Sequence, residues 1–397
     1  GVNAGNSIAS GGNYNTVVGD EAGTAITTGD INTFIGMDSG KATTTASSNT
    51  AVGAGALFAN TTGASNVAVG TYALDANTTA SNNTAVGYTS LSANTTGTSN
   101  TAIGRNALGA NTTANNNTAV GFNSLQSNIT GSENVAVGRS ALAVNTTGDN
   151  NIALGFNALG ANTTANNNIA LGTYALDNNI TGSENLAIGS ASLTNNTASN
   201  NIALGYSALT ANTTGASNVA VGTYALDANT TAANNTAVGH ASLSANTTGG
   251  QNVAVGKDAL LNNTTGNYNN ALGHQAVNAN TTGTENVGVG HNALLVNTTG
   301  NYNVAVGGFA LDANTTASYN TAVGYASLGA NTTGTQNTAM GAQSLSANTT
   351  GNYNVAVGQN NLLVNTTGDN NTALGAYVLD SNTTADNNTG VGALALA

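Results

Sequence analysis

The side chains best suited to metal or acid–base chemistry are three histidines, His240, His274 and His291. Each follows the glycine of a recurring five-residue motif, and His274 and His291 occupy neighbouring repeats, so these two could pair on a metal ion. No carboxylate and no third histidine recurs with them. Tyr, Phe, Arg, Lys and Ser fill the same place elsewhere. This tolerance indicates an exposed surface position, and we expect no metal site and no cofactor.

Five aspartates share a second place in the repeat and are the candidates for paired carboxyl chemistry. Two carboxyl groups that cleave a glycosidic bond lie roughly 5–9.5 Å apart. The nearest two of this set, Asp177 and Asp227, are 50 positions apart in the sequence, so their repeats are too far apart to bring the carboxyl groups within that distance. The Gly-Gly-x-Gly-x-Asp pattern of calcium-binding β-rolls, a Ser-His-Asp set and a phosphate loop are absent from the sequence. The sequence therefore predicts a protein that is not an enzyme. The five are Asp75, Asp177, Asp227, Asp312 and Asp380.

Tyrosines recur at fixed places as well, and four of them, Tyr72, Tyr174, Tyr224 and Tyr377, share one. They could form an aromatic surface that contacts a host glycan or protein. They could equally pack between associated chains. Repeat spacing alone does not separate these interpretations, so the four remain candidate surface contacts.

Composition excludes several classes of partner. Charged residues make up 5% of the 397 residues, and the net charge is −12 with four Lys and Arg. So few cations cannot neutralise a row of phosphates or an anionic membrane surface, and we expect no nucleic-acid partner. No apolar run reaches the length of a membrane helix, so we expect no membrane insertion by this segment. The opening GVNAGNSIAS has no initiator Met, which indicates a processed product or part of a longer fibre.

The elements that carry these residues repeat. The motif N-x-A-[VIL]-G ends in a glycine 23 times, from Gly19 to Gly392, in steps of 17 apart from one step of 16 between Gly189 and Gly205. We number each unit from the first Asn of this motif. Positions 2–4 and 7–9 read as short β-strands, broken by Gly at position 5 and by an Asn-Thr-Thr-Gly/Ala loop at positions 12–15. Gly at positions 5 and 15 is expected to supply the positive φ of the corners.

A short fixed unit of strands and turns is typical of a β-solenoid. The sequence thus predicts an all-β fold, a parallel β-solenoid or β-roll of about 23 coils that forms one continuous domain over residues 1–397. Coils spaced about 4.8 Å apart would align equal positions into ladders. The predicted ladder residues are aliphatic at position 4, Gly at 5, Leu at 9 and Asn at 12: Val86, Gly87, Leu91, Asn94, Ile103, Gly104, Leu108, Asn111, Val120, Gly121, Leu125 and Asn128.

The expected packing favours association of chains. Each coil offers two large apolar side chains, at positions 4 and 9, whose burial is worth about 3–6 kcal/mol. Ordering the backbone of one coil costs more than that. If position 4 faces inward, Ala at position 3 and Gly at position 5 leave the opposite face bare enough for another chain to approach closely. We therefore expect a side-by-side homotrimer that forms a rod or fibre.

The five-residue motif resembles the head repeat of trimeric autotransporter adhesins of the YadA type, and similar repeats occur in phage tail fibres. The resemblance rests on N-V-A-V-G and its variants N-L-A-I-G and N-T-A-I-G, and it covers essentially the whole chain. It implies a trimeric, left-handed parallel β-roll, although the family's head unit is shorter. The motif copies are at 66–70, 100–104, 134–138, 185–189, 218–222, 252–256, 303–307 and 354–358.

From these observations we expect an extracellular structural fibre or adhesin at a cell surface that mediates attachment or matrix formation. Its expected partners are further copies of itself, including end-to-end contacts, and a host glycan or protein. A phage tail fibre shaft on the virion is the nearest alternative. An ice-binding solenoid and a glycan-active enzyme are more distant ones. The Asn-Thr-Thr triplets match the N-glycosylation acceptor, and the sequence leaves open whether they are modified.

Overall fold

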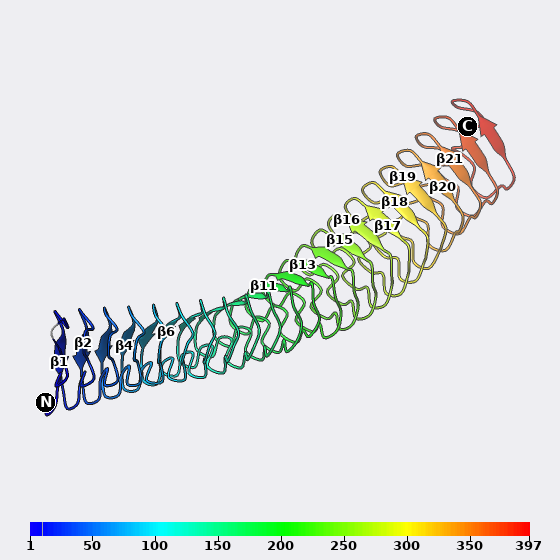
Figure 1. Cartoon of the computed structure of the whole chain (residues 1–397). Helices are drawn as coiled ribbons and strands as arrows, with labels where there is room; N and C mark the ends of the chain where they lie inside the picture. Colours follow the sequence, from blue (N-terminus) through cyan, green and yellow to red (C-terminus); the bar gives the residue numbers. More distant parts are fainter. Residues whose placement is uncertain (10) are drawn as a thin grey trace. The chain divides into compact units, whose positions relative to one another are not determined.

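The computed structural model describes residues 1–9 and 11–397. The chain has two compact units, residues 1–200 and 201–397. Each unit is an all-β, parallel β-solenoid, and the two together contain about 22 coils, nearly all of 17 residues. Within each unit the coils stack on one another with their strands side by side (Figure 1). The prediction of an all-β, parallel β-solenoid is therefore confirmed.

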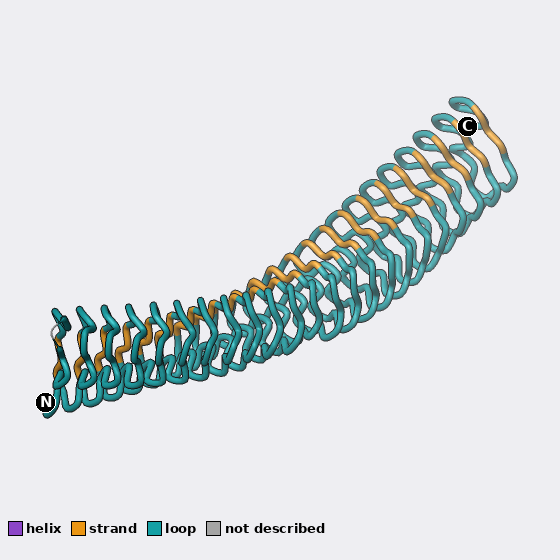
Figure 2. The backbone as a smooth tube through the Cα atoms, viewed as in Figure 1, coloured by secondary structure: helices purple, strands orange, loops and turns teal. Residues whose placement is uncertain are grey.

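Each coil contributes one strand of three residues, and the remainder of the coil is loop and turn (Figure 2). The strands of the first unit are β1 (Thr16–Val18), β2 (Thr33–Ile35), β3 (Thr50–Val52), β4 (Val67–Val69), β5 (Thr84–Val86), β6 (Thr101–Ile103), β7 (Thr118–Val120), β8 (Val135–Val137), β9 (Ile152–Leu154), β10 (Ile169–Leu171) and β11 (Leu186–Ile188). Those of the second unit are β12 (Ile202–Leu204), β13 (Val219–Val221), β14 (Thr236–Val238), β15 (Val253–Val255), β16 (Asn270–Leu272), β17 (Val287–Val289), β18 (Val304–Val306), β19 (Thr321–Val323), β20 (Thr338–Met340), β21 (Val355–Val357), β22 (Thr372–Leu374) and β23 (Thr389–Val391).

Neighbouring strands within a unit pair in parallel, at an offset of one repeat. Thr84 of β5 lies beside Thr101 of β6, and Val86 beside Ile103. Ile103 in turn lies beside Val120 of β7. Equal positions therefore form continuous columns, and a substitution in one coil is felt first in the coils on either side of it.

Positions 7–9 were expected to form a second strand, and that prediction is wrong. They form a turn in which positions 7 and 9 have left-handed backbone. At position 9, for example, φ is 52° at both Leu91 and Leu108. This conformation costs a residue with a Cβ roughly 1–2 kcal/mol, and burial of a leucine side chain, worth about 1.5–3 kcal/mol, offsets it. The turn points two consecutive residues inward, since Ala107 and Leu108 are both fully buried. A strand would have placed them on opposite faces.

The two glycine positions serve different purposes. Gly87, at position 5, has φ of 136°, and an added Cβ would lie 2.6 Å from the carbonyl oxygen of Gly104 in the next coil. Gly97, at position 15, does not have positive φ, so that part of the prediction is wrong. An added Cβ there would lie 2.2 Å from the carbonyl oxygen of Ala114. Position 15 is thus small because adjacent coils approach closely, not because of backbone conformation.

The faces of the strand are reversed from the prediction. Ala at position 3 is fully buried, as at Ala85 and Ala102, whereas position 4 faces outward, and Ile103 is 40% exposed. The reason lies across the narrow interior, where the inward Leu91 and Leu108 at position 9 leave room for little more than a methyl group. The small, bare face that was expected to receive another chain is therefore the inside of the coil.

Two columns of buried asparagine complete the interior. At position 12, Asn111 donates to Oδ1 of Asn94 (2.9 Å) and to the carbonyl oxygen of Ala114 (3.1 Å), while its own Oδ1 accepts from Asn128 (3.0 Å). At position 1, which was not singled out from the sequence, the backbone N–H of Asn100 donates to Oδ1 of the preceding motif Asn at 2.9 Å. Hydrogen-bonded amides can fill a dry interior, whereas an unpaired amide there would cost about 1–3 kcal/mol.

Candidate interaction surfaces

A feature that recurs along the surface of each unit is the outward side of the strands, positions 2 and 4, which we call the strand face. Position 4 is Val, Ile, Leu or Met in every strand, and position 2 is mostly Thr, Val or Ile. Ile103 is 40% exposed and Val253 39% exposed. Because the strands are in register, the position-4 side chains form a continuous aliphatic column, beside a mixed column of Thr and aliphatic side chains at position 2. An exposed apolar surface of this kind is typical of an interaction site.

The predicted ladder residues divide between this face and the interior. The aliphatic members Val86, Ile103 and Val120 lie side by side on the strand face. The leucines and asparagines of the same coils are fully buried. The predicted ladder therefore consists of one outward column and two inward ones, with the marker glycines at the corner between them.

The structure does not bring the four candidate tyrosines together. All four lie in the left-handed turn at position 7 with their rings outward, and Tyr72 is 48% exposed. Their coils are well separated along each unit. Tyr174 packs edge-on against Phe156 with ring centroids 5.2 Å apart, and Tyr224 packs against Tyr206 at 5.6 Å. Tyr174 and Tyr224 therefore belong to short local aromatic contacts, and the four tyrosines do not form one shared surface. Tyr377 lies in the same turn near the end of the second unit.

A denser tyrosine group lies at position 17, just before the strand, in the second unit. Tyr302 and Tyr319 occupy adjacent coils and stack with ring centroids 4.9 Å apart. Tyr268 and Tyr353 lie at the same position further along, and Tyr268 and Glu285 border a hollow of about 420 Å³ beside the strand face. The shared repeat position of these tyrosines is visible in the sequence, but stacking depends on the coil separation that only the structure supplies.

The histidines lie at the corner that follows the strand. His274 and His291 stack with ring centroids 5.3 Å apart and an interplanar angle of 9°. His240 is in another coil, where Nδ1 lies 3.8 Å from a carboxylate oxygen of Asp258. Among residues 1–9 and 11–397, no three His, Cys, Asp or Glu side chains gather in a group that could hold a metal ion. The pair therefore forms an aromatic contact.

Three of the position-10 aspartates are partly buried. Burial raises the pKa of Asp75, Asp177 and Asp312 above the usual value for a carboxyl group. Backbone N–H groups partly offset the effect of burial at Asp75 and Asp312. The three lie in different coils, so their carboxyl groups act separately.

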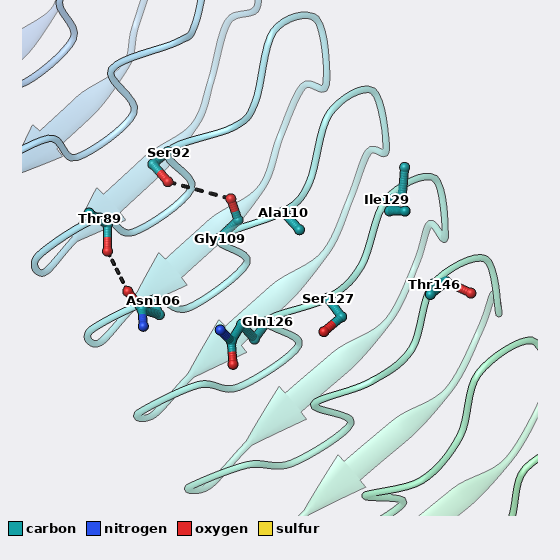
Figure 3. A pocket seen from close by; sticks show the side chains of 9 residues that line it. All are labelled: Thr89, Ser92, Asn106, Gly109, Ala110, Gln126, Ser127, Ile129 and Thr146. Carbon is teal, nitrogen blue, oxygen red and sulfur yellow. Dashed lines mark hydrogen bonds between the residues drawn. The ribbon is translucent and has the colours of Figure 1, made fainter.

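A hollow of about 600 Å³ lies along the turns of four coils in the first unit (Figure 3). Its lining is neutral, and its side chains bond along the stack: Ser92 donates to the carbonyl oxygen of Gly109 at 3.4 Å, and Thr89 to Oδ1 of Asn106. No lining residue supplies an acid, a base or a nucleophile activated by a base. The hollow is therefore a furrow between coils. It is lined by Thr89, Ser92, Asn106, Gly109, Ala110, Gln126, Ser127, Ile129 and Thr146.

The glycosylation triplets are closed in the folded coil. Asn111 of one Asn-Thr-Thr triplet is fully buried, and both of its amide hydrogens are engaged. Attachment of a glycan to that nitrogen would require the coil to open and would break the ladder. The folded coil of Asn111 therefore offers no acceptor at position 12.

Comparison with known proteins adds no relative, since neither the family models nor the curated proteins contain a match to this chain. Among the described residues, no helix is long and apolar enough to cross a membrane.

Proposed function

We propose that this chain is a segment of an extracellular structural fibre or adhesin that mediates attachment or matrix formation at a cell surface. The observation that carries the proposal is the strand face, where an outward aliphatic side chain recurs in coil after coil. The interior is already filled by Ala, Leu and paired Asn, so the outward column is not needed to complete the fold. A surface that is long, regular and without catalytic groups suits assembly and attachment better than turnover of a substrate.

The strand face favours side-by-side association, and we propose a homotrimer. Covering an aliphatic side chain that is about 40% exposed is worth about 1 kcal/mol. Repeated over the ten or more coils of a unit, this amounts to about 10 kcal/mol, which is comparable with the roughly 4–15 kcal/mol that association costs in lost freedom. Three chains arranged about a common axis would each bury the same face and close the contact. The number three also agrees with the resemblance of the motif to trimeric adhesin heads.

The same assembly would serve as a phage tail fibre shaft, which is the nearest variant of this proposal. In either setting the fibre is outside the cell, self-association provides length and stiffness, and a host glycan or protein is the partner for attachment. Variable residues at the edges of the strand, positions 6 and 17, are where such a partner would be recognised.

Light scattering on the purified chain, with negative-stain images of the same sample, tests the association. The chain mass is 38.6 kDa, so a trimer would have a mass of about 116 kDa. Rods three chains thick or longer fibres would agree with that mass. A mass of one chain at micromolar concentration would overturn the proposal.

Ice binding is a second candidate, because the strand face presents threonine side chains in register on one exposed surface, whereas the Asn-Thr-Thr loop does not. Thr95, at position 13 of the loop, donates its hydroxyl to the carbonyl oxygen of Thr112 in the next coil at 3.1 Å, so that hydroxyl is engaged internally. On the strand face, Thr84 and Thr101 lie in register on one exposed surface with the aliphatic column. Thermal hysteresis by a single-chain species would favour ice binding, and its absence from a trimer would favour the fibre.

A further inference from the structure

The first unit carries a row of alternating aromatic and arginine side chains at position 6 of five consecutive coils. We call it the arginine–aromatic row, and it consists of Tyr88, Arg105, Phe122, Arg139 and Phe156. The guanidinium carbon of Arg105 lies 5.8 Å from the ring centroids of both Tyr88 and Phe122. That of Arg139 lies 5.4 Å from the ring centroid of Phe156. Stacking against rings holds both arginines in place at the surface.

The two arginines differ from the two lysines in how they are paired. Lys41 forms ion pairs with Glu21 and with Asp38, the latter at 2.9 Å. Lys257 lies 3.6 Å from a carboxylate oxygen of Asp258. The guanidinium groups of Arg105 and Arg139 make no ion pair and no hydrogen bond with any of the described residues. The chain has 16 acidic residues, yet none of the described carboxylates forms an ion pair with either arginine.

An arginine stacked between rings still presents its N–H groups at the edge of the guanidinium plane, five on each side chain. That edge fits a carboxylate through two parallel hydrogen bonds. The coils that contain the row, residues 83–167, include only two acids, Glu133 and Asp149, so their net charge is zero against −12 for the whole chain. Both acids precede the strand, at positions 16 and 17, whereas the row follows it. The row therefore presents two cations without acidic partners in a segment that has no net negative charge.

We propose that the arginine–aromatic row binds a linear acidic polysaccharide that carries a carboxylate on every second sugar. Arg105 and Arg139 are two coils apart, about 9–10 Å at the strand spacing, and an aromatic ring lies between them. A pyranose polymer advances roughly one coil spacing per sugar. Carboxylates on alternate sugars would therefore meet the two arginines, and the intervening neutral sugar would lie on the ring of Phe122. This inference rests on the proposed attachment function and names the class of ligand.

The spacing favours a polysaccharide over a single-stranded nucleic acid. A nucleic acid carries a phosphate on every nucleotide and is bound by grooves with many cations. The row offers one cation for every two coils, and the chain as a whole is acidic. Nucleic acid is thus kept as an outcome of the test.

Biolayer interferometry at low ionic strength, with the full chain immobilised, tests the inference. The probe is short hyaluronan, in which a uronate alternates with a neutral sugar, and the comparison probes are carboxyl-reduced hyaluronan and oligothymidylate. The wild type is expected to bind hyaluronan and to bind the reduced polymer at least about tenfold more weakly. R105Q/R139Q is expected to lose at least about tenfold in affinity, as charge-assisted hydrogen bonds are removed. R105K/R139K keeps the charges without the planar fork and should be intermediate.

The matched control is K41Q/K257Q, which removes the same number of charges outside the row and should bind as the wild type does. No hyaluronan binding by the wild type, equal binding by R105Q/R139Q, equal binding of the reduced polymer, or tighter binding of oligothymidylate would each overturn the inference. Light scattering on the same preparations separates this result from the proposed assembly. A trimer that does not bind hyaluronan contradicts the ligand class alone, and a monomer that does bind it contradicts the assembly alone.

Discussion

The first coils of the first unit, residues 15–48, build their interior differently from the coils that follow. In nearly all later coils position 3 is Ala and position 9 is Leu, and position 12 is Asn. In the coil of β2 position 3 is Phe34, which is fully buried, and position 9 is Gly on both sides of it. An added Cβ on Gly40 would lie 2.5 Å from the ring of Phe34, and one on Gly23 would lie 3.1 Å from it.

The two regions have the same interior volume and the same backbone conformation in each coil, but different residues provide them. Position 9 is left-handed in both regions, with φ of 57° at Gly40 and 54° at Leu57. Glycine adopts this conformation without strain, yet the later coils use leucine, because there the side chain must fill the space that Phe34 fills here. The asparagine ladder at position 12 is also replaced, by Ile26 and Thr43.

Removing Phe34 should have the largest effect on this comparison. F34A leaves a cavity between two glycines that cannot fill it, and we expect a loss of about 3–5 kcal/mol in the stability of the first coils. G40L alone should also destabilise, since its side chain meets the ring. F34A/G40L recreates the Ala–Leu interior of the later coils and should recover most of the loss. Hydrogen exchange at β1–β3 measures this. Additive losses in the double variant would contradict the idea of exchanged volume.

Breaking the amide ladder should have the next largest effect. N111A leaves Oδ1 of Asn94 and one amide hydrogen of Asn128 without a partner, and we expect a loss of about 2–4 kcal/mol. The matched control T113A alters an exposed side chain in the same coil and should change stability by less than about 0.5 kcal/mol. Urea unfolding and hydrogen exchange of both variants provide the test. Equal stability of N111A and T113A would show that the ladder adds nothing.

The second unit contains a coil whose stability two substitutions should increase. Val277 stands at position 9 with φ of 52°, a strained conformation for a β-branched residue, and faces Gly288 at position 3. An added Cβ on Gly288 would lie 2.5 Å from Cγ2 of Val277. V277L/G288A restores the common interior, and we expect a gain of about 1–2 kcal/mol. G288A alone should destabilise. A stabilising G288A would contradict the account of the paired volumes.

The smallest expected effect concerns pH. Because burial raises the pKa of Asp75, Asp177 and Asp312, their protonated forms favour the folded state. Their contribution to stability is full below the unfolded pKa of about 3.9 and is lost as pH rises through the folded pKa. Relative to D75N/D177N/D312N, the wild type should gain about 1–2 °C in Tm between pH 7 and pH 4. Parallel pH profiles for the two proteins would contradict the role of burial.

Much of the fold could be predicted from the sequence because its strongest signals are backbone requirements. The marker glycines set the period and the corner, and asparagine recurring at position 12 indicated a ladder. The inward face could not be predicted. In a strand such as Val67–Val69, alternation separates the two Val from the Ala between them but does not say which side is the core. The turn at positions 7–9 determines which face of the strand is buried. In this turn leucine adopts a left-handed conformation, which its backbone propensity does not predict.

For the same reason, the candidate interaction surfaces could be predicted only in part from the sequence. Repeat position gave each tyrosine and each arginine its place within the coil, but their contacts depend on the coil spacing and on which edge of the strand they occupy. The variety of residues at position 6 indicated an exposed place. The same variety concealed the regular alternation of Arg105 and Arg139 with aromatic rings.

The central claim, that the outward aliphatic column drives association, is tested most directly by the solution mass of a variant with a charged strand face. V86E/I103E/V120E places carboxylates on the strand face of three consecutive coils, and T96E/T113E/T130E places them at exposed position 14 of the same coils. Light scattering should give a mass of about 116 kDa for the wild type and the position-14 variant, and 38.6 kDa for the strand-face variant. Equal masses for the two variants, whatever that mass is, would contradict the account.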